Sequence, residues 1–309
     1  MCRAEIARLV SFKLFFLRVL LRLAGLLSWR AVDALGGVFG FFLWHLRVRA
    51  RQVTEINIEL CLPELDPAER QRLARASIGD LGQTGLGLLK VWGTQPARVV
   101  AAVREVEGEA ILQRAREPGR GVLVLAPHHG NWEVAGLYLG QRYGLTSMYL
   151  PGRDEAMNEL VRDARSRSGA AVVPADNSGV RAILKSLKRG ELIGVLPDQI
   201  PKQAGVELAP FFGHPALTMT LVSNLLQKTG ARAVMATALR IAGGGFRLEF
   251  SEPDPELYHA DLATSLAALN RSVERLARQH PEQYQWEYKR WKARRGPKSD
   301  IYKGRRDTA

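Results

Sequence analysis

The chain has 309 residues, enough for one large domain or two modest ones, and carries 44 lysines and arginines against 31 aspartates and glutamates. The formal charge of +13 predicts a surface that attracts anions such as phospholipid headgroups, nucleic acid, phosphorylated substrates or acidic carrier proteins. Cys2 and Cys61 are the only cysteines, which argues against a disulfide framework and multi-cysteine metal sites and favours a reducing compartment. None of the six histidines has the H-E-x-x-H spacing of a zinc protease, so we expect no metal and no cofactor.

The first fifty residues are the most lipophilic part of the chain. A run over residues 12–29 is interrupted by Lys13, Arg18 and Arg22, and a second run over residues 31–46 is about as short as a spanning helix can be. These charges favour an amphipathic helical segment in a membrane interface, with a buried helix pair as the alternative. We therefore expect a membrane-associating segment at residues 1–50 and the main domain at residues 51–309.

A long helix is predicted after this segment. Asp66 is a candidate N-cap, Pro67 stands at the first helical position and Glu69 follows three residues after the cap. This is a capping-box arrangement, in which each of the two acidic side chains accepts a backbone N–H of the other's residue.

Beyond residue 106, strand-like and helix-like segments alternate. The strand-like runs cover residues 121–126, 146–152, 170–176, 191–199, 232–241 and 246–253, and the helix-like runs cover residues 132–142, 156–168, 178–188, 218–229 and 263–280. This alternation predicts an α/β fold with a central, mostly parallel or mixed sheet flanked by helices. Residues 243–246 (Gly-Gly-Gly-Phe) indicate a hairpin loop, because no helix follows them as one would follow a phosphate-binding loop.

Two adjacent histidines, His128 and His129, follow the first of these strands, and Glu133 lies in the first turn of the next helix. In this kind of fold the functional groups gather at the carboxyl ends of the strands. Glu133 could accept one ring N–H and leave the other ring nitrogen free to take a proton from a hydroxyl. The spacing does not choose between the two histidines, and a histidine that only satisfies a backbone carbonyl of the loop is an equal alternative.

Four segments, taken in chain order, carry a resemblance. The stretch His-His-Gly-Asn-Trp-Glu at residues 128–133 is similar to the H-x4-D/E motif of the glycerolipid acyltransferase superfamily. Residues 56–65 (INIELCLPEL), 194–218 (GVLPDQ to HPALT) and 281–297 (PEQYQW to RRGP) resemble segments of the bacterial late acyltransferases of lipid A biosynthesis. The resemblance spans residues 56–297 and implies a glycerolphosphate-acyltransferase-like fold in the main domain.

The resemblance also implies a reaction. His128 would be the general base, oriented by Glu133, and would remove the proton from an acceptor hydroxyl that attacks an acyl thioester. The implied donor is acyl carrier protein or acyl-CoA, and the implied acceptor is a hydroxyl of a lipid A precursor. Another glycolipid, a lysophospholipid or an aminolipid is the alternative acceptor, and a non-catalytic basic protein of the membrane surface is the alternative from another class. The implied location is the cytoplasmic face of the bacterial inner membrane.

Further residues are candidates for substrate binding. Arg153, Arg165 and Arg167 are candidates for holding phosphate or the carrier, since a guanidinium can bind phosphate oxygens bidentately. Asp198 and Gln199 end a strand at the functional edge. An acyl-chain pocket is expected at Trp132, Phe211 and Phe212.

The C-terminal stretch, residues 284–306, interleaves aromatic side chains with cations. This pattern suits both an interfacial membrane belt and nucleic acid, and the resemblance favours contact with membrane phospholipids and no nucleic acid.

Overall fold

The computed structural model describes residues 3–149, 158, 159, 161, 165, 167, 171–200, 205–292, 301 and 302, with the backbone alone for residues 3–14 and 149. Arg153 lies outside the described residues. The first half of the chain contains α1 (Arg3–Leu26), α2 (Trp29–His45), α3 (Arg49–Cys61), α4 (Pro67–Gly93), α5 (Pro96–Val100), β1 (Val103–Glu107), α6 (Glu109–Arg116), β2 (Val122–Leu125), α7 (Trp132–Tyr143) and β3 (Leu145–Tyr149). The second half contains β4 (Ala171–Pro174), α9 (Asn177–Lys188), β5 (Leu192–Val195), β6 (Val206–Phe211), β7 (His214–Met219), α10 (Leu221–Thr229), β8 (Arg232–Arg240), β9 (Phe246–Ser251), η1 (Pro255–Tyr258), α11 (Leu262–Gln279) and η2 (Pro281–Gln283).

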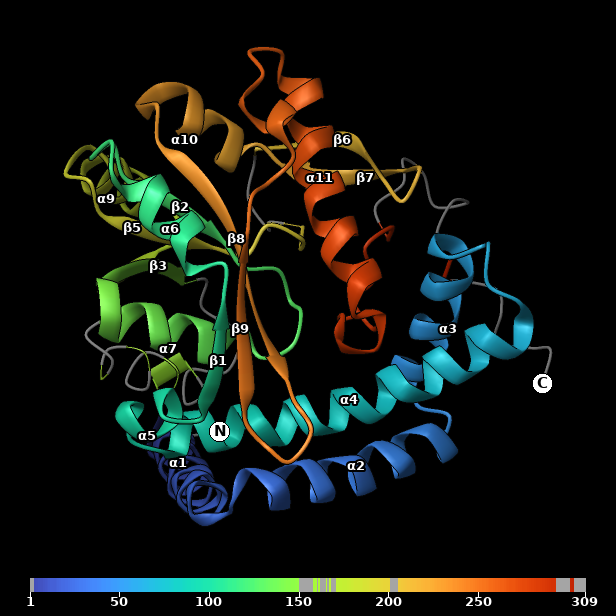
Figure 1. The fold of residues 1–309 in the computed structure, drawn as a ribbon. Coiled ribbons are helices and arrows are strands. Elements are labelled where there is room, and N and C mark those ends of the chain that lie inside the picture. The colour runs from blue at the N-terminus through green and yellow to red at the C-terminus, as the bar shows by residue number, and fades with distance from the viewer. Residues whose placement is uncertain are drawn as a thin grey trace.

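A seven-stranded mixed sheet forms the centre of the molecule, with the strand order β1-β9-β8-β2-β5-β3-β4 (Figure 1). Strands β8, β2, β5, β3 and β4 pair in parallel, whereas β9 runs antiparallel to β8 and parallel to β1. The predicted α/β fold with a mostly parallel or mixed sheet is therefore confirmed. The carboxyl ends of β2 and β5 are neighbours at one edge of this sheet.

Both faces of the sheet are covered, as the continuous apolar run of β2 predicts. Val122 and Val124 pack against α7, while Leu123 and Leu125 pack on the opposite face with side chains of α9, α10 and α11. All four residues are buried because successive side chains of a strand point to opposite faces and helices cover both.

Helices α1, α2 and α4 form a layer below the sheet, where α2 and α4 are side by side, and α3 stands above the right-hand part of α4 (Figure 1). Asp66 and Glu69 make the predicted capping box at the start of α4, and this expectation is confirmed. Glycines let the two helix backbones approach closely: a Cβ atom at Gly40 would lie 2.6 Å from the Cα atom of Gly79, and one at Gly82 would lie 2.2 Å from the carbonyl oxygen of Gly36.

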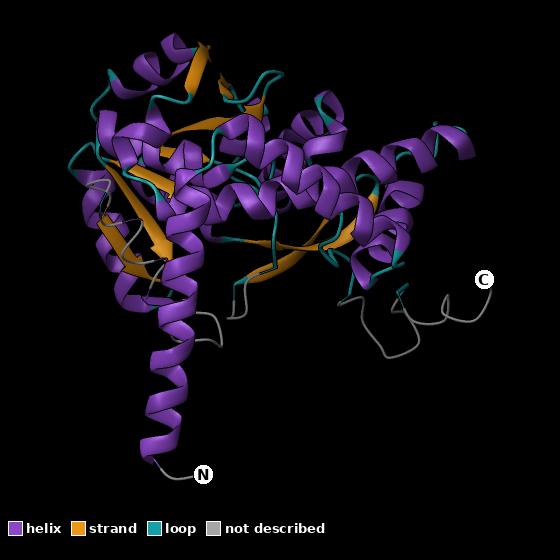
Figure 2. Ribbon diagram, turned by 90° about the horizontal axis from the view of Figure 1, so that it is seen from below, coloured by secondary structure: helices purple, strands orange, loops and turns teal. Residues whose placement is uncertain are grey.

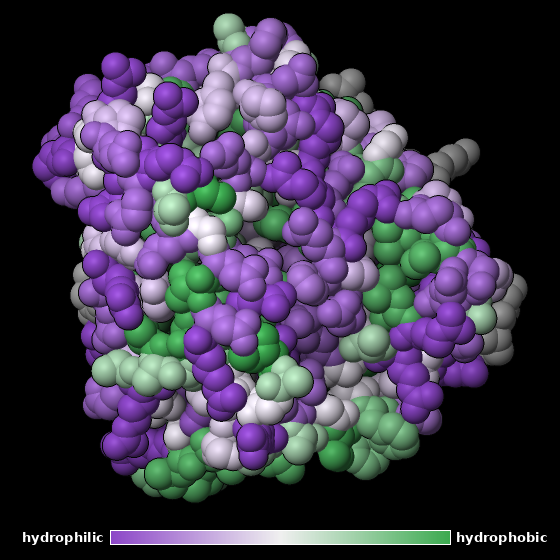
Figure 3. Space-filling model, viewed as in Figure 1, coloured by the Kyte–Doolittle hydropathy of each residue, from purple (hydrophilic) through white to green (hydrophobic). Residues whose placement is uncertain are grey.

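The outer surface of this layer is apolar. Helix α1 projects from the rest of the molecule (Figure 2), and apolar residues gather along the edge of the molecule that α1 and α2 form (Figure 3). Exposed large side chains here include Phe15, Phe16, Leu20, Leu23, Leu26, Leu35, Val38, Phe39, Phe41, Phe42 and Leu46. In the described part of the chain no helix alone has the length and apolarity to cross a membrane, while α2 and α3 pass that test together as a pair bent by 84°.

Two elements differ from the sequence prediction. Strand β1 begins at Val103, before the region in which strands were expected, and pairs at the sheet edge with β9. Residues 214–219 form strand β7 of a separate antiparallel hairpin with β6, where the start of a helix at residue 218 was predicted. The Gly-rich loop does join two antiparallel strands, β8 and β9, as predicted.

Candidate active site

The loop between β2 and α7 is held by backbone hydrogen bonds from two distant segments. The N–H of Gly130 donates to the carbonyl of Gln283 at 2.9 Å, and the N–H of Asn131 donates to the carbonyl of Ala238 at 2.8 Å. Gly130 has φ +61°, and a Cβ atom there would lie 2.3 Å from the carbonyl oxygen of Ala238. Because only glycine fits this approach without strain, the loop that carries both histidines has one defined path.

His128 is bound at two points by one carboxylate. Its ring Nδ1 lies 2.9 Å from Oδ1 of Asp198, and its backbone N–H donates to Oδ2 of the same residue at 2.9 Å. Burial raises the pKa of Asp198, but the ring and the backbone N–H of His128 outweigh that effect and hold the pKa below its usual value. The carboxylate is therefore charged and accepts the Nδ1 proton, which leaves Nε2 of His128 as the basic nitrogen.

The structure gives Glu133 a different partner from the predicted one. Its carboxylate forms a two-point ion pair with Arg165, in which Nε of the arginine lies 3.2 Å from Oε2 and Nη2 contacts Oε1. The predicted hydrogen bond from the His128 ring to Glu133 is thus corrected to a bond with Asp198. The physical reason is the order of the strands. Because β2 and β5 are parallel neighbours, the residues that follow these two strands meet at one edge of the sheet. The spacing of residues within one loop does not reveal which strand lies next to β2.

His129 points into the protein and has a structural role. The side chain is buried, and Nε2 donates to the carbonyl of His280 at 2.9 Å. Burial lowers the pKa of His129 to about 4, more than the hydrogen bond to His280 raises it, so the ring is neutral at pH 7. Of the two histidines, His128 lines a pocket, whereas His129 lines neither pocket described below.

Two pockets meet at Trp132, whose indole packs against the ring of His128 with a centroid distance of 4.6 Å. The first, called here the apolar pocket, carries the Glu133–Arg165 pair at its lining. Its other lining residues are mostly apolar: Val124, Ala126, Trp132, Gly136, Leu137, Leu139, Leu145, Ser147, Met148, Gly194, Val195 and Leu196.

The second pocket, called here the polar pocket, includes His128. One wall comes from α4 and the other from the segment that follows α11. Its lining residues are Ser77, Asp80, Leu81, Thr84, Gly85, Leu88, His128, Gly130, Trp132, Gln283, Tyr284, Gln285 and Glu287.

The remaining predicted residues lie in several environments. Arg165 lines the apolar pocket, whereas Arg167 donates to the carbonyl of Trp92 at 2.6 Å. Gln199 donates to the side chain of Gln285 at 2.9 Å and so braces a wall of the polar pocket.

Phe211 and Phe212, expected in the acyl-chain pocket, are both buried. They pack in the core with Trp291 and Trp286, respectively, and line neither pocket at His128.

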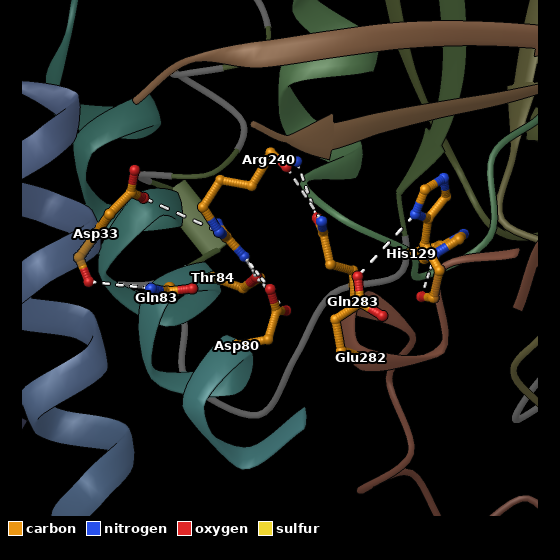
Figure 4. Close-up of polar contacts among 9 residues, drawn as sticks. Asp33, Asp80, Gln83, Thr84, His129, Arg240, Glu282 and Gln283 are labelled. Carbon is orange, nitrogen blue, oxygen red and sulfur yellow. Dashed lines mark hydrogen bonds and ion pairs between the residues drawn. The ribbon is translucent and has the colours of Figure 1, made fainter. Parts of the chain in front are cut away.

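A buried ion cluster supports the site and was missed in the sequence (Figure 4). Arg240, at the end of β8, pairs with Asp80 of α4 and lies 3.9 Å from the carboxylate of Asp33 in α2. The side chain of Gln283 exchanges hydrogen bonds with the backbone of Arg240, and its carbonyl accepts the N–H of Gly130. The signal in the sequence was that Asp33, Asp80 and Arg240 each stand as a lone charge in an apolar run. Such a charge indicates a buried ion pair but does not identify its partner.

Comparison with known proteins adds evidence of a different kind. Residues 3–293 match the model of the family described as bacterial lipid A biosynthesis acyltransferase. The lipid A biosynthesis palmitoleoyltransferase of Escherichia coli (strain K12) is 30% identical over 256 residues, which cover 82% of each chain. The lauroyltransferase of the same organism is 26% identical over 275 residues, or 87% of each chain. The myristoyltransferase is 25% identical over 295 residues, which are 89% of this chain and 90% of the relative.

Proposed function

Since the chain belongs to the bacterial lipid A biosynthesis acyltransferase family and is an acyltransferase, we propose that it moves a fatty acyl chain from an acyl thioester to a hydroxyl of a lipid A precursor, with His128 as the general base. The observation that carries the assignment of the base is the pair of His128 and the buried carboxylate of Asp198 at the point where an apolar and a polar pocket meet.

In the proposed reaction, Asp198 accepts the Nδ1 proton of His128 and fixes the tautomer in which Nε2 carries a lone pair. Nε2 takes the proton of the acceptor hydroxyl while that oxygen attacks the thioester carbon. The tetrahedral intermediate then expels the thiolate, which receives the proton from the imidazolium. An ester and a free thiol result, and the carboxylate of Asp198 stabilises the imidazolium between the two steps.

The start of α7 offers electrostatic help to this reaction. Asn131 caps the helix by accepting the N–H of Val134, while the N–H groups of Trp132 and Glu133 belong to the first turn, where the helix dipole favours negative charge. In the proposal Glu133 holds Arg165 at the lining of the apolar pocket, where the guanidinium faces the thioester or the phosphate of its carrier. The role of Glu133 is thus to position a cation.

The apolar pocket suits the acyl chain, and Trp132 stays in the proposed lining of the acyl site. Glycines at positions 136 and 194 open this pocket between α7 and the sheet. Each buried methylene is worth about 0.8 kcal/mol, so the depth of the pocket would select chain length. Phe211 and Phe212 are not part of this proposal because they line neither pocket.

The surface supports the proposed partners and location. The charge of +13 suits an acidic acyl carrier protein, with acyl-CoA as the alternative donor. Helices α1 and α2 carry exposed apolar side chains together with the exposed Arg18 and Arg30, a composition that favours the interface of an anionic membrane. We place the enzyme at the cytoplasmic face of the bacterial inner membrane.

The test is the lipid composition of cells that lack this protein and receive either the wild type or His128→Ala. The proposal predicts that lipid A lacks one acyl chain in the null and the His128→Ala cells and regains it with the wild type, as read by mass spectrometry. Loss of an acyl chain from another lipid, with lipid A intact, would keep the reaction and replace the acceptor. Full acylation by His128→Ala would refute the assigned base.

A further inference from the structure

The polar pocket is lined by acidic side chains, which is unusual in a chain whose net charge is +13. Among the described residues that line it, Asp80 and Glu287 are carboxylic acids and none is lysine or arginine. Besides the imidazole of His128, the other polar side chains there are hydroxyls and amides, which are uncharged. The pocket is therefore the opposite of a phosphate-binding site, in which arginine, lysine or a helix N-terminus faces the ligand.

The two acids are not equivalent. Asp80 is bound from behind by Arg240 and also accepts the hydroxyl of Thr84 at 3.1 Å, so an opposite charge compensates it (Figure 4). Glu287 has no ion-pair partner among the described residues. Burial raises the pKa of Glu287, and hydrogen bonds from its own backbone N–H and from the side chain of Gln285 oppose that rise. Glu287 is thus the acid of the pocket without a direct ion pair, and the charge that His128 can carry is the nearby one that lowers the pKa of Glu287.

The position of Glu287 is built by its neighbours. Gln199 follows Asp198 in the chain, and its side-chain amide donates to Oε1 of Gln285 at 2.9 Å. The side chain of Gln285 in turn lowers the pKa of Glu287. Glu287 and His128 both line the polar pocket, and a carboxylate accepts hydrogen bonds from the donors of a ligand.

Resting on the proposed function, we infer that the polar pocket binds an uncharged, hydroxyl- and amide-bearing part of the acceptor, and that Glu287 is a specificity residue that keeps phosphate out of this position. Hydroxyl and amide N–H donors complement the carboxylates and amide oxygens of the lining. A phosphate would meet two carboxylates, with no lysine or arginine among the described lining residues. The hydroxyl of the acceptor must reach Nε2 of His128, and His128 lines the polar pocket, so the acceptor enters on this side. The acyl chain occupies the apolar pocket.

The experiment compares Glu287→Gln with Glu282→Gln in the full-length purified protein. Both variants remove one carboxylate from the same segment, but Glu282 is half-exposed and does not line the polar pocket. We expect Glu287→Gln to raise KM for the acceptor about tenfold, since hydrogen bonds to a charged group are among the stronger ones, with kcat and the donor KM unchanged. Glu282→Gln should leave all three values unchanged.

Two soluble sugars test the charge selection directly. N-acetylglucosamine should compete with the acceptor for the wild type, and N-acetylglucosamine 6-phosphate should compete at least about tenfold more weakly. The difference should shrink in Glu287→Gln and persist in Glu282→Gln. Equal or stronger competition by the phosphorylated sugar, or no competition by the neutral sugar, would overturn the inference.

The outcomes separate this inference from the proposed function. If His128→Ala abolishes transfer and Glu287→Gln leaves the acceptor KM unchanged, only the assignment of the polar pocket fails. A raised donor KM in Glu287→Gln would assign the pocket to the hydroxyl- and amide-bearing arm of the thioester carrier, and would also overturn the inference. If His128→Ala transfers at the wild-type rate, the proposed function itself fails.

Discussion

The loop that carries His128 and the crossing of α2 with α4 are linked through the Arg240 cluster, yet they are held by different physical means. Hydrogen bonds that the backbone N–H groups of the loop donate to Asp198, Ala238 and Gln283 fix the loop. The helix crossing is fixed by missing side chains, because glycines allow the two backbones to touch. The active-site loop should therefore respond to the loss of one polar atom, and the helical layer to the addition of one methyl group.

The largest effect is expected in the loop. Asp198→Asn has nearly the same shape, but its amide can donate to Nδ1 of His128 and then favours the wrong tautomer. We expect kcat to fall about 10³- to 10⁴-fold while the melting temperature stays close to that of the wild type, as measured by steady-state kinetics and thermal unfolding.

Asp176→Asn is the matched control for Asp198→Asn. Asp176 caps α9 at an exposed position, and asparagine caps a helix as well as aspartate does. Its kcat should be unchanged. Wild-type turnover in Asp198→Asn would show that the imidazole does not depend on this carboxylate.

The second effect concerns the helix crossing. A Cβ atom at Gly40 would lie 2.6–2.9 Å from backbone atoms of Ile78 and Gly79, so Gly40→Ala must push the helices apart. We expect the free energy of unfolding to fall by about 3 kcal/mol, as measured by urea denaturation.

Gly79→Ala supplies the control at the same crossing. A Cβ atom at Gly79 meets nothing within 4 Å, so the better helix propensity of alanine should raise stability by up to about 1 kcal/mol. If both substitutions change stability equally, close backbone approach is not what holds α2 against α4.

The smallest effect is the pH dependence that His129 contributes. Its pKa is about 4 in the folded protein and near 6.5 in the unfolded chain, so between these values the unfolded state binds the extra proton. The stabilisation is fully present above pH 6.5 and is lost as the pH falls toward 4. From pH 6.5 to pH 5 the wild type should lose about 2 kcal/mol more than His129→Gln does, measured by denaturation at each pH. Parallel pH curves for the two proteins would refute this burial effect.

Much of the fold was readable from local patterns. The capping box at Asp66, the buried run of β2 and the hairpin loop at residues 243–246 each depend on residues close together in sequence. Residues 218 and 219 were wrongly assigned to a helix because a short apolar run fits a strand or the start of a helix, and pairing with β6 decides between them.

The candidate site was only half readable for the same reason. His128 and its loop follow from local spacing, and Asp198 was expected at the functional edge of the sheet. That Asp198 reaches the ring depends on β5 lying next to β2, which a single sequence does not state. The contacts of Arg240 with Asp33 and Asp80 likewise join residues 160 or more positions apart.

The adjacent histidines offer the most direct test of the central claim. Purified His128→Ala and His129→Ala would each be assayed for acyl transfer from a thioester to a lipid A precursor, with the product identified by mass spectrometry. His128→Ala should lose about 10²- to 10⁴-fold in kcat without loss of stability, and His129→Ala should lose stability while its folded fraction keeps its turnover. An active His128→Ala beside a stable but inactive His129→Ala would contradict the assignment of the base.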